Sequence, residues 1–227
     1  NIFGGDVVLM DYIIKNGQII DGLRHQPFHG DILISNGTIQ EISSHLEIPA
    51  DFPAENILDA NGGYITPGFI DIHRHGDWQA LHQGDDELLN RQGLTSVVNG
   101  NCGLSVAPAG EKYARQIYDF LGSVTGKLEQ DPLPLMNSMN NYMHALSKAK
   151  RSVNTGMLAG NGTIRAAVKG YASGKLSDEE VHQVWKILEE ALSAGSLGVS
   201  LGVAYAPEFE CDRDGLAQVL QPLKDTD

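Results

Sequence analysis

The chain has 227 residues, is 41% hydrophobic and carries a formal net charge of −13 at pH 7, which describes a folded protein with a sizeable core. The acidic balance argues against nucleic acid and anionic membranes as partners, since both need clustered lysine and arginine. Two cysteines cannot form a disulfide framework, and no apolar run approaches a membrane span, so we expect a soluble, cytoplasmic protein.

The sequence divides into three parts. Residues 1–9 precede Met10, where a natural start would fit, and are expected to be an added extension that takes no part in the fold. Residues 10–66 are rich in short β patterns, whereas residues 67–227 alternate strand and helix patterns. We therefore predict a small β module followed by an α/β domain.

Two Asn-Gly pairs organise the β module. Alternating β patterns at residues 11–20 and 31–42 are each interrupted by such a pair, at 16–17 and 36–37, which favours tight hairpins. One more strand is expected at residues 56–60. The pattern predicts a small antiparallel sheet.

Strand and helix patterns alternate in the second part. Strands are predicted at residues 69–72, 94–99, 153–159 and 197–203, and helices at 86–92, 111–121, 135–150, 178–194 and 214–224. Repeated strand-then-helix units favour a parallel sheet covered by helices, as in a (β/α)8 TIM barrel. A closed barrel needs roughly 200 residues or more and only about 160 follow Pro67, so we expect about the first four units of a truncated barrel.

Residues 68–77, with the sequence GFIDIHRHGD, are the most informative segment. Their apolar, β-branched start reads as a buried strand. Because side chains alternate along a strand, His73 and His75 are expected to point the same way at its end, where two imidazoles can hold a divalent metal. The competing interpretation is a histidine pair that makes only local hydrogen bonds.

Cys102 follows the next predicted strand, in a Gly-Asn-Cys-Gly loop. Since neighbouring parallel strands end at the same edge of a sheet, His73, His75 and Cys102 are candidates for ligands of one metal ion. An inert buried thiol is the alternative for Cys102. Asp77 and Asn101 are candidates for orienting a ligand, although turn formation explains them as well.

A metal with an open coordination position polarises a carbonyl group and activates water for hydrolysis of an amide or ester-like bond. The reaction also needs a general base, and residues 68–227 offer no convincing one. Asp71 lies one step below the histidines on the strand and is expected to be structural. The sequence therefore predicts an incomplete hydrolytic site.

Four segments carry a resemblance to a known family. Residues 65–75 (ITPGFIDIHRH) resemble the opening strand of the amidohydrolase superfamily, and the β module resembles the N-terminal part of that family's β-sandwich. Residues 100–103 (GNCG), 160–165 (GNGTIR) and 198–207 (GVSLGVAYAP) together resemble its N-acyl-D-amino-acid deacylase, or D-aminoacylase, branch. The resemblance implies a metal-dependent hydrolase with an α/β fold.

The resemblance also implies roles for particular residues. His73, His75 and Cys102 match metal ligands of a centre that holds zinc, as one or two ions, and acts on a small-molecule substrate. Two further histidines, from the fifth and sixth strands, and a general-base aspartate, from the eighth, are expected beyond residue 227. Relatives typically carry histidine where this chain has Asn161, which makes Asn161 a candidate on the substrate side of the centre.

Three hypotheses on function remain open. The first is a zinc-dependent hydrolase of linear, non-peptide amides that deacylates N-acyl-D-amino acids, with the truncated chain itself inactive. The second is a cyclic amidohydrolase, similar to dihydroorotase or hydantoinase. The third is a non-catalytic half barrel that forms a homo-oligomer through its unpaired strand edges.

Overall fold

The computed structural model describes residues 10–23, 25–82, 84 and 86–225, so the extension expected at residues 1–9 lies outside the described part. The chain forms two compact units, which meet in sequence between Gly68 and Phe69. Among the described residues, none of the helices combines the length and the apolar character needed to cross a bilayer.

The first unit is a five-stranded mixed sheet. Its elements are β1 (Tyr12–Ile19), β2 (Phe28–Ser35), β3 (Thr38–Ser43), the 3-10 turn η1 (Ala54–Asn56), β4 (Ile57–Asp59) and β5 (Tyr64–Ile65). β1 is antiparallel to β2 but parallel to β4 and β5, so the prediction of an antiparallel sheet is wrong for the last two strands. A long connection, not a tight turn, brings β4 alongside β1, and such a connection permits parallel pairing.

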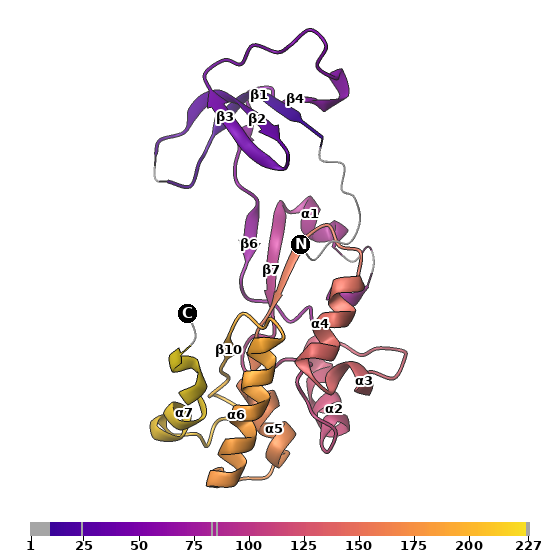
Figure 1. Cartoon of the computed structure of the whole chain (residues 1–227), viewed down its shortest axis with the longest axis vertical. Helices are drawn as coiled ribbons and strands as arrows, with labels where there is room; N and C mark the ends of the chain where they lie inside the picture. Colours follow the sequence, from indigo (N-terminus) through magenta and orange to yellow (C-terminus); the bar gives the residue numbers. More distant parts are fainter. Residues whose placement is uncertain (1–9, 24, 83, 85, 226–227) are drawn as a thin grey trace. The chain divides into compact units, whose positions relative to one another are not determined.

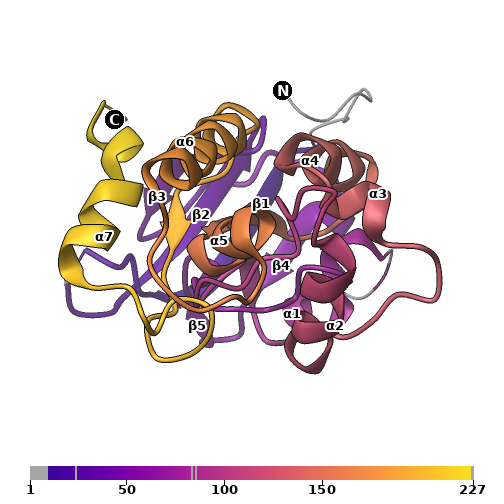
Figure 2. The same ribbon diagram turned by 90° about the horizontal axis from the view of Figure 1, so that it is seen from below.

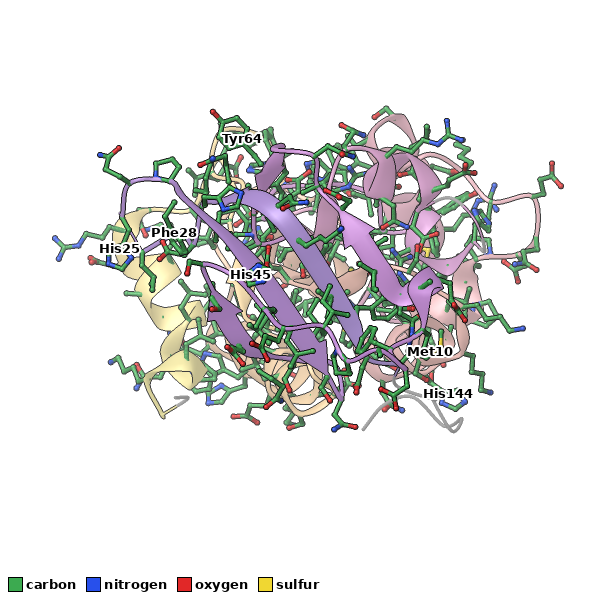
Figure 3. All side chains as sticks on the ribbon, turned by 90° about the horizontal axis from the view of Figure 1, so that it is seen from above. Met10, His25, Phe28, His45, Tyr64 and His144 are labelled. Carbon is green, nitrogen blue, oxygen red and sulfur yellow. The ribbon has the colours of Figure 1, made fainter. Side chains whose placement is uncertain are left out.

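The second Asn-Gly pair forms the predicted hairpin. Asn36 and Gly37 have φ angles of 52° and 72° and join β2 to β3, which pair in antiparallel register. Two successive positive φ angles match the right-handed twist of the strands on either side of a tight turn. Figure 3 looks onto this sheet, with His45 in front of its strands and Phe28 and Tyr64 towards its rim.

The hairpin predicted at the first Asn-Gly pair is wrong. β1 continues through Asn16, and a register shift between Ile14 and Gly17 marks a β-bulge instead of a turn. The backbone N–H of Asn16 donates to Asp31 Oδ1 at 2.9 Å, and its side-chain amide donates to Asp59. These bonds hold Asn16, at a φ of 58°, inside a strand.

The second unit alternates strands and helices. Its strands are β6 (Phe69–Asp71), β7 (Leu94–Asn99), β8 (Asn154–Met157), β9 (Ala159–Gly160) and β10 (Val199–Ser200). Its helices are α1 (Glu87–Arg91), α2 (Ala114–Thr125), α3 (Leu133–Met136), α4 (Met139–Lys148), α5 (Asn161–Lys169), α6 (Asp178–Ser193) and α7 (Arg213–Val219), with 3-10 turns η2 (Gln79–Leu81) and η3 (Gln221–Asp225). β6, β7 and β8 pair in parallel in chain order, and β9 pairs in parallel with β10.

The helices of this unit form two groups around the strands. α2, α3 and α4 gather on one side and α6 and α7 on the other, with α5 between them in contact with α2 and α6 (Figures 1 and 2). Apolar side chains from these helices and from β8 fill the core between them. Its fully buried members include Ile117, Leu121, Met136, Met139, Tyr142, Met157, Ile164 and Leu188.

The strand that carries the histidines is not buried as predicted. Phe69, Ile70 and Ile72 are 56%, 64% and 70% exposed. Among the described strands, β6 pairs only with β7 and therefore lies at an edge of its sheet. The apolar composition indicates a strand correctly but does not show what lies beside it.

Several predicted boundaries also change. The helix predicted at residues 135–150 is divided into α3 and α4, because the Ser138 hydroxyl accepts a hydrogen bond from Asn141 N at 3.1 Å and begins a new helix. The predicted third strand breaks at Leu158, and the fourth shortens to β10. α5 begins directly after β9, at Asn161, where the sequence pattern predicts no helix.

Candidate metal centre

The structure brings His73, His75 and Cys102 together. Each offers one ligand atom, and these atoms all lie within 4.8 Å of one another. His73 Nε2 is 3.0 Å from Cys102 Sγ, and the two imidazole rings are 5.9 Å apart at an interplanar angle of 72°. Among the described residues, this group contains no carboxylate.

Short-range hydrogen bonds shape the histidine segment. β6 ends at Asp71, whose Oδ1 accepts the backbone N–H of His73 at 3.1 Å and whose other carboxylate oxygen lies 3.7 Å from the Arg74 guanidinium. The backbone N–H of Gly76 then donates to Asn99 Oδ1 at 2.9 Å, at the end of β7. These bonds tie the segment to the end of β6 through Asp71 and to the end of β7 through Asn99.

The cysteine loop has an unusual backbone. Cys102 has a φ of 58°, in the left-handed region that residues other than glycine rarely adopt. Gly100 and Gly103, on either side of it, have φ angles of 75° and 70°. The glycines turn the chain sharply after β7, and the turn places the thiol against the imidazole of His73.

Asn101 contacts this loop's surroundings and none of the three candidate ligands. Its side-chain amide donates to the backbone carbonyls of Val98, at 2.9 Å, and Arg74, at 3.3 Å. The contacts join the cysteine loop to the histidine segment. Both interpretations of Asn101, turn formation and orientation of a ligand segment, are compatible with these bonds.

Asp77 is fully buried and is hydrogen-bonded to the cysteine loop. Its carboxylate accepts the backbone N–H groups of Gly100, at 3.3 Å, and Val106, at 3.0 Å, and its own carbonyl accepts the Tyr142 hydroxyl at 2.6 Å. Burial raises the pKa of Asp77 to about 6. Asp77 thus fixes the start of the cysteine loop without touching its thiol.

Because the pKa of Asp77 is raised on folding, we expect the free energy of unfolding to depend on pH. Its pKa of about 6 in the folded chain exceeds the ordinary value of 3.8, so the folded state binds this proton more tightly. The resulting contribution to stability is complete below pH 3.8 and is lost as the pH rises through about 6. The difference between these pKa values corresponds to about 3 kcal/mol.

We expect the Asp77→Asn variant, studied without metal, to lack this dependence. The difference in unfolding free energy between variant and parent chain should change by about 3 kcal/mol between about pH 4 and pH 8 in urea titrations. Asp86→Asn is a control of opposite sign, because the backbone N–H of Ser152 lowers the pKa of that buried carboxyl. A difference that stays constant with pH would contradict the raised pKa of Asp77.

Asn161 faces a residue that the sequence did not single out. Its side-chain amide donates to Glu208 Oε1 at 2.6 Å, and both side chains are buried. Ser200 was also missed: its hydroxyl accepts the N–H of Gly103 at 2.9 Å. Glu208 lies in a polar segment typical of an exposed loop, so neither periodicity nor composition signals its burial.

The donor set fits a divalent metal of the zinc type. Two imidazoles and one thiol are common zinc ligands, and three protein ligands with a further open position are typical of catalytic zinc. The Nδ1 atom of His75 is buried and has no hydrogen-bond partner. Burial, and then the neighbouring His73, lower the pKa of His75, which favours the neutral imidazole that binds metals.

Sequence comparison relates the chain to deacylases. It is 33% identical over 216 residues to N-acyl-D-aspartate deacylase and 34% identical over 214 residues to N-acyl-D-glutamate deacylase, both from Alcaligenes xylosoxydans xylosoxydans. These alignments cover 94% and 92% of this chain but 41% of each relative. A scan against protein-family models finds no match.

Solved structures give the same relationship. An N-acyl-D-glutamate deacylase from Bordetella bronchiseptica, in complex with zinc and a phosphonate inhibitor, superposes with a TM-score of 0.77 at 29% identity, over 95% of this chain and 43% of that one. A D-aminoacylase described as defining a subset of amidohydrolases superposes with a TM-score of 0.75 at 27% identity, over 94% and 43%. The chain thus has the α/β amidohydrolase fold and, over most of its own length, is homologous to the N-acyl-D-amino-acid deacylases of the D-aminoacylase type.

Proposed function

We propose that these residues belong to a metal-dependent hydrolase that removes the acyl group from N-acyl-D-amino acids. The observation that carries the proposal is the group of His73, His75 and Cys102 at the ends of two parallel strands, in a chain homologous to deacylases. The substrate on this proposal is a small linear amide, and the products are a carboxylate and a free D-amino acid.

His73, His75 and Cys102 would hold zinc, the metal described in the Bordetella bronchiseptica structure. When bound, zinc supplies Lewis-acid polarisation of the amide carbonyl and activation of water. A binuclear centre is described for a D-aminoacylase that superposes with a TM-score of 0.74, so one or two ions are both compatible with the proposal.

The chain's own residues prepare the ligands. Burial lowers the pKa of His75, which favours its neutral imidazole, and the network around Asn99 and Asp77 fixes the two ligand segments relative to each other. The general base is not among the three clustered side chains. On the family resemblance it is an aspartate expected beyond residue 227.

We further propose a domain arrangement for this function. Residues 10–66 would form the N-terminal part of a β-sandwich, and residues 67–227 the first four units of a (β/α)8 barrel. Support comes from the parallel order of β6, β7 and β8, and from the division of contacts between Gly68 and Phe69. The chain spans about 41% of the length of the deacylases it matches.

The test is an assay of the polypeptide at its natural length, established first by intact-mass measurement. Zinc-loaded protein should release free amine from N-acetyl-D-aspartate, N-acetyl-D-glutamate or N-acetyl-D-alanine, but not from the L enantiomers, and chelation should abolish the release. Dihydroorotate and hydantoin are cyclic amides, and assays with them test the second hypothesis, that of a cyclic amidohydrolase. Ring opening of either compound, without release of any D-amino acid, would refute the deacylase proposal.

A further inference from the structure

A buried glutamate that the proposed chemistry does not use lies against the cysteine loop. Glu208 is 1% exposed and follows β10 in the loop at residues 201–212, far from the cysteine loop in sequence. A carboxylate buried to this extent is costly unless donors satisfy it. Its surroundings therefore show what holds it in place.

The donors to Glu208 come from two different segments. Asn161 Nδ2 donates to Oε1 at 2.6 Å, and the backbone N–H of Gly202 donates to Oε2 at 2.8 Å. The backbone N–H of Gly162 also faces the carboxylate. Burial raises the pKa of Glu208, and these three donors partly oppose that rise. Glu208 thus joins the start of α5 to the loop after β10.

The third segment at this point is the cysteine loop, and it contacts Glu208 by packing. A Cβ atom placed on Gly103 would lie 1.9 Å from Glu208 Oε2, so the carboxylate occupies the space next to the Gly103 backbone. Gly202 is equally close to the loop, because a Cβ there would lie 2.1 Å from the carbonyl oxygen of Cys102. Both contacts leave the loop no room to move towards Glu208.

Hydrogen bonds from α5, from β10 and from the loop after β10 complete the support of the cysteine loop. The Tyr205 hydroxyl donates to the carbonyl of Cys102, and the Thr163 N–H donates to the carbonyl of Gly103 at 3.0 Å. Ser200 Oγ accepts from Gly103 N at 2.9 Å and donates to the Gly100 carbonyl at 2.5 Å. Every one of these partners lies in α5, in β10 or in the loop that contains Glu208.

We propose that Glu208 is a positioning residue for the thiol of Cys102, acting by locking the start of α5 and the loop after β10 against the cysteine loop. The inference rests on the proposed metal centre, because its effect is exerted through a ligand of that centre. Glu208 touches neither the thiol nor the imidazoles in this arrangement. Its loss changes where the sulfur lies, and therefore how tightly a metal is held.

The test uses cobalt as a spectroscopic probe of the thiolate. Cobalt(II) bound by Cys102 gives a sulfur-to-metal charge-transfer band in the near ultraviolet, and Cys102→Ser removes that band. Glu208→Gln keeps the size of the side chain but replaces one of the two accepting oxygens with an NH2 group, so the side chain can no longer accept from both Asn161 and Gly202. We expect cobalt affinity to fall by roughly 10-fold or more, with a weaker band at saturation.

Glu210→Gln is the matched control, since it makes the same chemical change two residues away, where the carboxylate accepts the N–H of Gly174. Its cobalt affinity and band should equal those of the parent chain. Should Glu208→Gln fail to fold, Asn161→Ala removes one donor and should give a smaller loss in the same direction. Circular dichroism establishes folding in each case.

The outcomes separate the two proposals. If the parent chain gives no band that depends on Cys102, the metal centre itself is wrong. If the band is present, but folded Glu208→Gln and Asn161→Ala both retain full affinity and intensity, the metal centre stands and the positioning role of Glu208 is wrong. A loss shared equally by Glu210→Gln would also overturn it, because the effect would not be specific to Glu208.

Discussion

Replacing His75 with alanine should lower the affinity of the chain for zinc by roughly 100-fold or more, because one of three clustered donors is lost. The same result is expected for His73→Ala. Competition with a chromophoric chelator measures the affinity, and elemental analysis after gel filtration measures the zinc content. Unchanged zinc content in both variants would refute the metal centre.

Two features make this experiment specific. Nδ1 of His75 has no hydrogen-bond partner, so its removal breaks no hydrogen bond at that atom, and the metal-free variant should unfold close to the parent chain in urea. His144→Ala is the matched control. His144 is exposed on α4 and is labelled in Figure 3; removing it should leave zinc binding unchanged.

Replacing Gly100 with alanine should destabilise the second unit by at least about 3 kcal/mol. A Cβ atom there would lie 2.2 Å from the carbonyl oxygen of Leu158, at a φ of 75° that already strains an alanine. Leu158 cannot easily move, because its own N–H donates to the carbonyl of Asn99 at 3.0 Å. Urea unfolding measures the loss.

Gly126→Ala separates the two causes of this loss. Gly126 has a nearly equal φ of 79°, but a Cβ atom there would meet nothing within 4 Å. Its substitution should therefore cost only the backbone strain, about 1–2 kcal/mol. Equal losses in the two variants would show that the contact with Leu158 has no energetic weight.

Local patterns predicted most of the elements that position the centre. The apolar run before Asn99 predicted β7 at its observed bounds, and the helix predicted at residues 178–194 begins where expected, with a complete capping box formed by Ser177 and Glu180. Strand alternation and parallel pairing also predicted that His73, His75 and Cys102 lie close together, as they do in the structure. These predictions depend on interactions within a few residues, or on the rule that parallel strands end at one edge.

The missed features depend on contacts between distant segments. The bulge at Asn16 is held by Asp31 and Asp59, whereas the Asn-Gly pair at residues 36–37 forms the turn between β2 and β3. Glu208 is buried because Asn161 and Gly202 converge on it, which no local pattern encodes. The exposure of β6 likewise depends on which strands lie beside it.

The support of the cysteine loop affects the thermodynamics of metal binding. Its backbone is held by Asp77, Ser200 and Tyr205, and these bonds are made by the protein alone. The loop therefore has little conformational entropy left to lose when an ion binds, and little apolar surface to bury. Calorimetry of metal binding should therefore show a small heat-capacity change, and the affinity of the centre should vary with temperature almost as a single van't Hoff line.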